Sequence, residues 1–256
     1  MSPEKRRLEA LALVRSGQKM LVEDLASALG ASRETIRRDL AELDRRGLLR
    51  KIHGGAVVAE PGVDAFSLEG PFADRVALNV AAKRAIARAA ARLFQPGDSL
   101  FIDTGSTTIL FAEELASKPG LTVITNSATI ATLVAKAPDS KVFLLGGEFR
   151  RGGQESVGDL TSHQIGQFRP GHAVLTVAAV SGNGYMDHDF QEAQVARAMA
   201  RQAASVTVLA DATKIGLRAV CELGPLTMAA RLVTDAAPAS LADALADAEV
   251  DVLVAD

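Results

Sequence analysis

The sequence predicts two structural parts, a winged helix-turn-helix followed by an α/β domain built on a parallel sheet. Charge divides the chain, since residues 1–58 carry 12 Lys and Arg against 8 Asp and Glu, whereas residues 59–256 carry 16 against 23. Apolar residues recur at helical spacing in the first part, and short apolar runs alternate with helical stretches in the second. We therefore expect a small basic domain over 1–58, a linker containing Pro and Gly over 59–74, and an α/β domain over 75–256.

Composition excludes several classes of protein. Of the 256 residues 48% are hydrophobic, which is enough to form a core and excludes a disordered chain. No apolar run approaches the roughly 20 residues that span a membrane, and the first residues do not form an apolar signal segment. Cys221 is the single cysteine, so neither an internal disulfide nor a Cys/His zinc site is expected. These features predict a soluble cytoplasmic protein without a metal or a cofactor.

Three helices are expected in the basic domain. Apolar residues at helical spacing predict helices over 4–16, 21–29 and 33 to about 46. Gly30 closes the second helix, and Ser32 stands where the N-cap of the third is expected. Two helices joined by a short turn with Gly are typical of a helix-turn-helix, and the first helix completes its core.

The third helix carries side chains suited to reading a DNA groove. Arginine makes bidentate contacts to guanine in the major groove, and Ser or Thr reaches a base or a phosphate. Two short extended runs around Gly54 and Gly55 predict a β-hairpin wing that adds cationic contacts to phosphate. The residues expected to contact DNA are Ser32, Arg33, Thr35, Arg37, Arg38, Lys51 and His53. A small helical domain with a solvated basic face is the alternative, and Asp39 either holds an arginine in place or is solvated.

The second part of the chain alternates helices with strands. An Ala-rich helix is expected over 76–94. The strand-like runs are 99–103, 121–125, 141–145, 173–178, 205–210, 231–234 and 250–254. This alternation predicts a parallel sheet, and such sheets bind ligands beyond the carboxyl ends of their strands.

Polar loops follow several of these strands. Behind the first strand, a Gly turn and hydroxyls open a helix, whose N-terminal N–H groups suit a phosphate. The carboxylates after the fourth strand, in a loop that also contains Asp187, suit the hydroxyls of a sugar or polyol. The expected ligand-binding residues are Asp103, Thr104, Gly105, Ser106, Thr107, Thr108, Thr125, Asn126, Gly146, Gly147, Asp189, Glu192, Asp211 and Lys214. One such loop is equally well explained by helix capping, whereas several at one sheet edge favour a pocket for a phosphorylated polyol. Neither G-x-x-x-x-G-K-[ST] nor G-x-G-x-x-G occurs, which argues against nucleoside triphosphates and dinucleotides.

The basic domain resembles a known family. Residues 32–43 read Ser-Arg-Glu-Thr-Ile-Arg-Arg-Asp-Leu-Ala-Glu-Leu and are followed by Gly47-Leu48-Leu49 and by His53-Gly54-Gly55-Ala56. This pattern resembles the winged helix-turn-helix signature of DeoR-type bacterial transcriptional repressors. The loop over 103–108 is similar to the family's phosphate loop, and 125–127, 146–147 and 211–214 also fall at its motif positions. The resemblance implies a sensor domain with the phosphosugar isomerase fold.

The resemblance also implies partners. They are double-stranded operator DNA, a phosphorylated sugar or polyol, and further copies of the chain in a dimer or tetramer, without a membrane. Lys83 matches a lysine of the family, which either points toward the phosphate or is solvated. The segment 189–192 is most similar to that of members governing glycerol 3-phosphate metabolism, so this compound is the first candidate effector. The sequence departs from that pattern at 177–182 and has His188 where Phe is usual.

Two other functions stay open at this point. An aldose–ketose phosphate isomerase with an appended DNA-binding head would use Asp103, Asp189 or Glu192 as a general base. Such an enzyme has no need of the head, and the Asp-rich catalytic segment of the isomerases has no counterpart over 177–182. An architectural DNA-binding protein would not respond to any small molecule. We therefore expect a regulator and not an enzyme.

Overall fold

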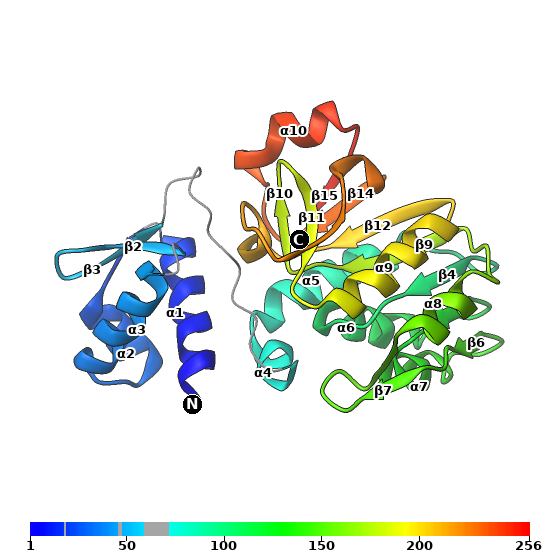
Figure 1. Cartoon of the computed structure of the whole chain (residues 1–256), viewed down its shortest axis with the longest axis horizontal. Helices are drawn as coiled ribbons and strands as arrows, with labels where there is room; N and C mark the ends of the chain where they lie inside the picture. The colour runs from blue at the N-terminus through cyan, green and yellow to red at the C-terminus, as the bar shows by residue number, and fades with distance from the viewer. Residues whose placement is uncertain (18, 46–47, 59–71) are drawn as a thin grey trace. The chain divides into compact units, whose positions relative to one another are not determined.

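The computed structural model describes residues 1–17, 19–45, 48–58 and 72–256, which divide into two compact units, 1–78 and 79–256 (Figure 1). Most of the linker expected over 59–74 lies outside the described residues. Each unit has its own core. Within the described ranges, a search for a helix both long and apolar enough to cross a membrane finds none.

Within the N-terminal unit, the described residues up to 58 form three helices and a small sheet. The helices are α1 (Pro3–Gly17), α2 (Val22–Leu29) and α3 (Arg33–Arg45). The antiparallel sheet has the order β1-β3-β2, from β1 (Lys19–Leu21), β2 (Leu49–Ile52) and β3 (Gly55–Val58). The helices and the β2–β3 hairpin confirm the winged helix-turn-helix, whereas β1 is a strand that the sequence analysis missed. Ile36, Leu40 and Leu43 of α3 are fully buried, as their helical spacing predicts.

A buried carboxylate joins two of these helices. Asp39 of α3 is 2% exposed, and its two oxygens accept hydrogen bonds from the Nε atoms of Arg6 at 2.5 Å and Arg7 at 3.1 Å. Both arginines belong to α1. Of the two alternatives for Asp39, the one in which it holds an arginine in place is therefore correct, and the solvated one is wrong. The arginines that it holds are on α1 and are not its neighbours on α3.

The C-terminal unit is built on a seven-stranded, wholly parallel sheet with the order β15-β14-β12-β9-β4-β5-β6. Its strands are β4 (Ser99–Ile102), β5 (Thr122–Thr125), β6 (Lys141–Leu144), β9 (His172–Thr176), β12 (Ser205–Leu209), β14 (Arg231–Thr234) and β15 (Asp251–Val254). All seven lie within one or two residues of the expected runs, so the parallel-sheet prediction is confirmed.

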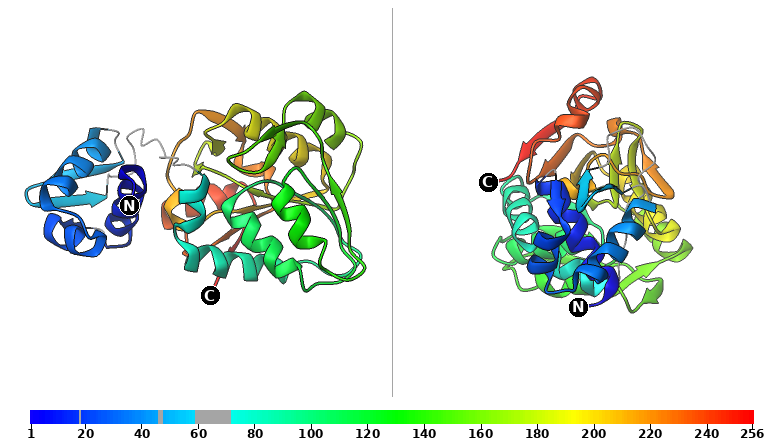
Figure 2. Two further views of the ribbon diagram at one scale, coloured as in Figure 1. Left: turned by 90° about the horizontal axis from the view of Figure 1, so that it is seen from below. Right: turned by 90° about the vertical axis from the view of Figure 1, so that its left-hand side faces the viewer.

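Helices cover both faces of this sheet (Figures 1 and 2). Leu100 and Ile102 of β4 pack into one core with α5 (Val80–Ala91), α6 (Ser106–Leu115) and α7 (Ala128–Val134). Phe101 points to the opposite core, with α9 (Phe190–Gln202) and α10 (Ala242–Asp247). Side chains of a strand alternate between its two faces, so a strand covered on both sides is apolar throughout.

The remaining elements depart from the sequence analysis. The helix expected over 76–94 is two helices, α4 (Phe72–Ala77) and α5, separated where Asn79 adopts a positive φ of 53°. Two small antiparallel sheets were also missed. One pairs β7 (Glu148–Arg150) with β8 (Glu155–Val157), and the other has the order β10-β11-β13, from β10 (Ala179–Ser181), β11 (Gly184–Asp187) and β13 (Cys221–Gly224). The helix α8 (Asp159–Ile165) follows β8.

The buried carboxylate of the N-terminal unit generates a stability prediction. We expect Asp39→Ala to lower the free energy of the local unfolding of α1 and α3 by about 2 kcal/mol. The variant loses two charge-assisted hydrogen bonds, and the loss stays moderate because water can still solvate the two arginines. Hydrogen exchange of peptides from α1 and α3 measures this change. The control is Asp24→Ala on the exposed side of α2, which should have little effect. Equal protection in the two variants would contradict the assigned role of Asp39.

Candidate functional site

The N-terminal unit presents the arginines of α3 to solvent. The side chains of Arg33, Arg37 and Arg38 are 65%, 62% and 79% exposed. Each lies near a glutamate, Arg33 at 2.9 Å from Glu23 and the other two at 4.0 and 3.4 Å from Glu34. Exposed ion pairs of this kind contribute little stability, so these guanidinium groups can exchange a glutamate for another anion at small cost.

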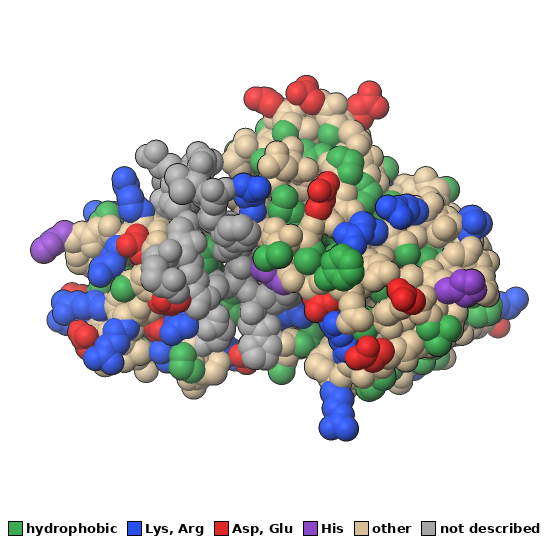
Figure 3. Space-filling view, viewed as in Figure 1, with side chains coloured by type: hydrophobic (Ala, Val, Ile, Leu, Met, Phe, Trp, Pro, Cys, Tyr) green, Lys and Arg blue, Asp and Glu red, His purple; other side chains and the backbone are tan. Residues whose placement is uncertain are grey.

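The other residues that are expected to contact DNA lie at the start of α3 and on the β2–β3 hairpin. The hydroxyl of Ser32 accepts a hydrogen bond from the Thr35 backbone N–H at 3.1 Å, so Ser32 caps α3. The two hydroxyls lie 2.8 Å apart. Lys51 of β2 and His53 of the turn after it are exposed. Lys and Arg side chains gather on the face of this unit seen in Figure 3.

In the C-terminal unit, the strand order reverses direction between β4 and β9. From β4 the chain adds β5 and β6 on one side, and it then crosses to β9 and adds β12, β14 and β15 on the other. At such a switch point the loops beyond two neighbouring strands separate, which makes room for a ligand. The segment Asp103–Thr108 follows β4 there and opens α6.

Asp103 ties the two strands together at this point. One carboxylate oxygen accepts a hydrogen bond from the Thr176 backbone N–H at 2.9 Å, and the other lies 3.4 Å from the Thr176 hydroxyl, which donates to it. Asp103 is 6% exposed, and this burial, with the nearby charges of Asp187 and Glu155, raises its pKa well above the ordinary value. Asp103 therefore positions the loop and does not present a free carboxylate.

Gly105 permits a close approach at the same place. A Cβ atom on this residue would lie 2.1 Å from the Thr176 hydroxyl, so no larger residue fits. Gly105 is also the N-cap of α6, and no side chain caps this helix. The first N–H groups of α6 and the half-buried hydroxyl of Ser106 are thus placed as an anion site requires.

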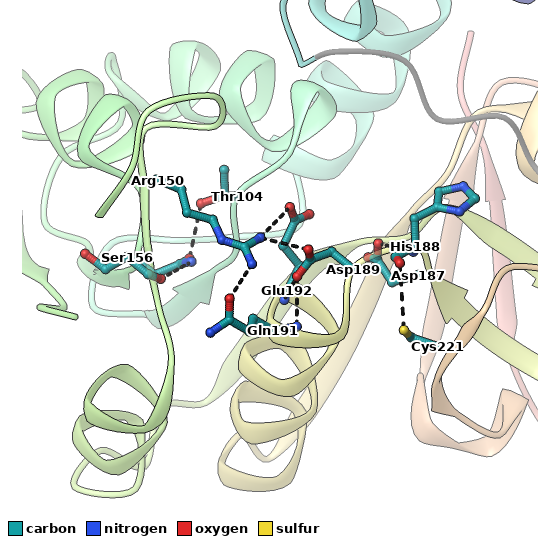
Figure 4. Close-up of polar contacts among 10 residues, drawn as sticks. Thr104, Arg150, Ser156, Asp187, His188, Asp189, Gln191, Glu192 and Cys221 are labelled. Carbon is teal, nitrogen blue, oxygen red and sulfur yellow. Dashed lines mark hydrogen bonds and ion pairs between the residues drawn. The ribbon is translucent and has the colours of Figure 1, made fainter. Parts of the chain in front are cut away.

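The loop after β5 meets this one. The hydroxyl of Thr104 donates to the side-chain oxygen of Asn126 at 3.3 Å, and the amide of Asn126 donates to the Ser156 carbonyl at 3.0 Å (Figure 4). Two of the expected residues are therefore in direct contact, and β8 joins them through Ser156.

Other expected residues are engaged locally. The hydroxyl of Thr108 donates to the Gly105 carbonyl at 3.1 Å, Thr125 accepts from the Ser127 N–H at 3.1 Å, and Ser127 caps α7. Gly146 is bonded through its N–H and its carbonyl to Gln164 and Thr161 of α8. A Cβ on Gly147 would lie 2.0 Å from the Thr161 hydroxyl. Thr107 is buried in the first turn of α6. These hydrogen bonds and close approaches shape the loops that follow β4, β5 and β6.

Asp211 and Lys214 lie just beyond β12, and Lys83 lies in α5. Asp211 is buried, caps the short 3-10 helix η1 (Ala212–Lys214) through the Thr213 N–H at 3.0 Å, and lies 3.5 Å from the amide of Asn79. Lys214 is half-buried. Lys83, one turn into α5, is 4% exposed and engaged in an interaction, so the solvated alternative for this lysine is wrong.

The carboxylates expected in a loop after the fourth strand are held by secondary structure instead. Asp187 lies in β11, Asp189 caps α9 by accepting from the N–H groups of Gln191 at 2.8 Å and Glu192 at 3.0 Å, and Glu192 lies in α9. The missed β10–β11 hairpin explains the difference. Although partial burial raises the pKa of Asp189, hydrogen bonds from Arg150 and from these N–H groups more than offset it, so the pKa is lowered.

Arg150 is the functional candidate that the sequence analysis missed. It lies at the end of β7, and its guanidinium contacts Asp189, Gln191 and Glu192 (Figure 4). The available signal was the pair Arg150-Arg151 before Gly152-Gly153, a basic turn close behind a strand end. No sequence rule assigns such a turn to α9, because the contact depends on how the β7–β8 hairpin folds back.

Among the described residues, no group of three or more His, Cys, Asp or Glu is placed to hold a metal ion. A surface cavity of about 560 Å³ lies between α9 and β13 and contains none of the expected ligand-binding residues. Its lining is Arg197, Ala200, Arg201, Glu222, Leu223, Gly224, Pro225 and Met228.

Comparisons with known proteins identify relatives along the whole chain. The family model "DeoR-like helix-turn-helix domain" matches residues 6–61, and "DeoR C terminal sensor domain" matches residues 78–236. The chain is 30% identical over 239 residues to the glycerol-3-phosphate regulon repressor of Escherichia coli (strain K12), covering 93% of each protein. It is 30% identical over 248 residues to the HTH-type transcriptional repressor CsqR of the same strain, covering 96% of this chain and 93% of that one.

A solved structure of D-ribose-5-phosphate isomerase in complex with phospho-erythronic acid is also similar. It shares 17% identity with a TM-score of 0.39, over 54% of this chain and 53% of that chain, so the likeness spans about half of each.

The buried carboxyl at the switch point predicts an unusual pH dependence. The pKa of Asp103 in the folded state lies above its value in the unfolded state, near 3.8. As pH rises through the interval between these two values, the unfolded state releases its proton first, so the folded state loses relative stability. We expect the free energy of unfolding of the wild type to fall relative to Asp103→Asn as pH rises from about 4.

Denaturation curves at a series of pH values measure this difference. Asn retains an oxygen for the Thr176 N–H, so the variant should fold. Asp243→Asn, on the exposed side of α10, is the control and should follow the wild type at each pH. A difference between wild type and Asp103→Asn that stays constant with pH would contradict the raised pKa.

Proposed function

Because this chain belongs to the DeoR family, we propose that it is a transcriptional repressor controlled by a phosphorylated sugar or polyol, with glycerol 3-phosphate as the first candidate. The N-terminal unit would bind operator DNA, and the effector would bind the C-terminal unit. The names of the relatives, all transcriptional repressors among those given above, indicate a regulator rather than an enzyme.

One observation carries the proposal for the effector. The uncapped N-terminus of α6 begins at the switch point of a parallel sheet, beside the hydroxyls of Thr104 and Ser106. Helix N-termini supply unpaired N–H groups and positive potential, which favour phosphate. Lys214 adds a cation in the loop beyond β12. Carboxylates of Asp189 and Glu192 would accept hydrogen bonds from polyol hydroxyls.

The DNA-binding part of the proposal is supported by exposure and charge. Arg33, Arg37 and Arg38 lie in the first turns of α3 and are largely exposed, and Thr35 lies among them. In a helix-turn-helix these turns enter the major groove. Lys51 and His53 are exposed on the wing, where contacts to phosphate are expected.

Assembly is part of the same proposal. Helix-turn-helix proteins commonly bind two half-sites as dimers, so we propose a homo-oligomer, either a dimer or a tetramer. The effector would act by binding one conformation of the C-terminal unit more tightly than another, since only a difference in affinity shifts a conformational equilibrium.

The exposed arginines of α3 generate a prediction about DNA binding. We expect Arg37→Ala combined with Arg38→Ala to weaken binding by at least about tenfold, because each good base contact is worth about 1–3 kcal/mol. Fluorescence anisotropy would measure affinity for a duplex that the wild type selects from a random library. The control is Arg92→Ala, an exposed arginine of the C-terminal unit. Unchanged affinity of the double variant would remove α3 from the interface.

The proposed effector site generates a prediction about stabilisation by phosphate esters. A thermal-shift screen of the full chain should show stabilisation by glycerol 3-phosphate or another sugar phosphate, and about 2.7 kcal/mol is expected at a hundred times the dissociation constant. Ser106→Ala and Lys214→Ala should each weaken the response, because a hydrogen bond to a charged group is worth about 1.5–3 kcal/mol. Lys136→Ala, an exposed lysine after α7, is the control. A panel without any responding phosphate would refute the sensor role.

A further inference from the structure

Arg150 is held at the beginning of α9 by three side chains of one helical turn. Its Nη1 atom lies 3.0 Å from Asp189 Oδ2 and 3.7 Å from Glu192 Oε1, and its Nη2 donates to the side-chain oxygen of Gln191. The side chains of Arg150, Asp189 and Glu192 are 27%, 36% and 22% exposed. The cluster is therefore partly desolvated, yet open enough for a small anion in solution to reach it.

The guanidinium lies between two groups of polar residues. In Figure 4, Asp189, Gln191 and Glu192 are on one side, and Thr104 and Ser156 are on the other. Thr104 precedes the uncapped N-terminus of α6 and bonds to Asn126, which is bonded to Ser156. Arg150 is paired with Glu155 across the β7–β8 hairpin, and the charge of Glu155 influences the pKa of both Arg150 and Asp103. The cation that pairs with Asp189 and Glu192 therefore lies near the end of β4, where the loop that the proposed function assigns to phosphate begins.

Several carboxylates lie near Arg150. Glu155 and Asp187 lie close enough to Asp103 to influence its pKa, and Asp189 and Glu192 add two more carboxylates beside Arg150. A phosphate dianion entering this region meets repulsion unless a cation turns toward it. Arginine suits that task, because its planar fork binds the oxygens of a phosphate as readily as those of a carboxylate.

We propose that Arg150 binds the phosphate of the effector, and that Asp189 and Glu192 occupy the guanidinium until the phosphate displaces them. This inference rests on the proposed function and adds a competition inside the effector site. When phosphate takes Arg150, the first turn of α9 loses its tie to the β7–β8 hairpin, and the carboxylate oxygens that faced Arg150 can accept hydrogen bonds from polyol hydroxyls. The exchange gives the effector a different affinity for the tied and the released arrangements, which is what regulation requires.

The competition has a quantitative consequence. If Arg150 is available for only a fraction of the time, the apparent dissociation constant of a phosphate is raised by the inverse of that fraction. Removing Arg150 should therefore weaken the binding of phosphate, whereas neutralising its two carboxylate partners should strengthen it. A purely structural tie predicts the same sign for both changes, because each would only loosen the hairpin.

The test is calorimetric titration of the full chain with inorganic phosphate, glycerol 3-phosphate and glycerol. Arg150→Ala should bind both phosphates at least about tenfold more weakly, the loss expected for a charge-assisted bond. Asp189→Asn combined with Glu192→Gln should bind inorganic phosphate more tightly than the wild type, and should gain less for glycerol 3-phosphate because the hydroxyl acceptors are weakened. Asn caps a helix as well as Asp does, so this variant keeps the start of α9.

Arg151→Ala is the matched control, since Arg151 is the exposed neighbour of Arg150, and it should bind like the wild type. Circular dichroism checks that each variant is folded. If the wild type binds the phosphates and Arg150→Ala binds them equally well, the role of Arg150 is refuted while the proposed function stands. Weaker binding of inorganic phosphate by the Asp189/Glu192 variant would refute the competition. Failure of the wild type and that variant alike to bind any phosphate would overturn both proposals.

Discussion

The hydrogen bonds between Asp103 and Thr176 are the constraint on which the C-terminal unit depends. They join the ends of β4 and β9, the neighbouring strands at which the order of the sheet reverses, and they orient the Gly105 turn that opens α6. A carboxyl buried beside other carboxylates is costly to ionise. Its retention there is explained by two hydrogen bonds to one residue, which join the ends of the two strands.

The N-terminal unit uses the same device for a different purpose. Asp39 of α3 is buried and binds Arg6 and Arg7 of α1. Arg37 and Arg38, which are also on α3, remain exposed. Neighbouring residues of a helix point in different directions, so one segment carries both the group that fixes its orientation and the groups that remain available for DNA. In both units a buried aspartate joins two segments, Asp39 through the side chains of Arg6 and Arg7 and Asp103 through Thr176. Arg37 and Arg38 on α3, like Arg150 in the other unit, are paired with carboxylates of the chain.

Sequence alone determined the elements and their order. Apolar periodicity is local, so it located the three head helices and all seven parallel strands, and Ser32 and Gly30 marked the ends of helices through local backbone chemistry. The polar residues after each strand were identifiable as candidates because parallel strands end at one edge. The helix break at Asn79 and the small antiparallel sheets were missed, because their strands mix polar with apolar residues and lack the continuous apolar run of a strand that is covered on both faces.

Only the tertiary structure decided which candidates lie together. The reversal of strand order between β4 and β9 selected Asp103–Ser106, and Thr176, an apparent interruption of an apolar run, became the partner of Asp103. Folding of the β7–β8 hairpin brought Arg150 to residues about forty positions further along the chain. Burial excluded the solvated one of the two alternatives for Lys83. Each of these facts depends on contacts between distant segments, and a local pattern of residue types contains no information about which distant segment will pack against it.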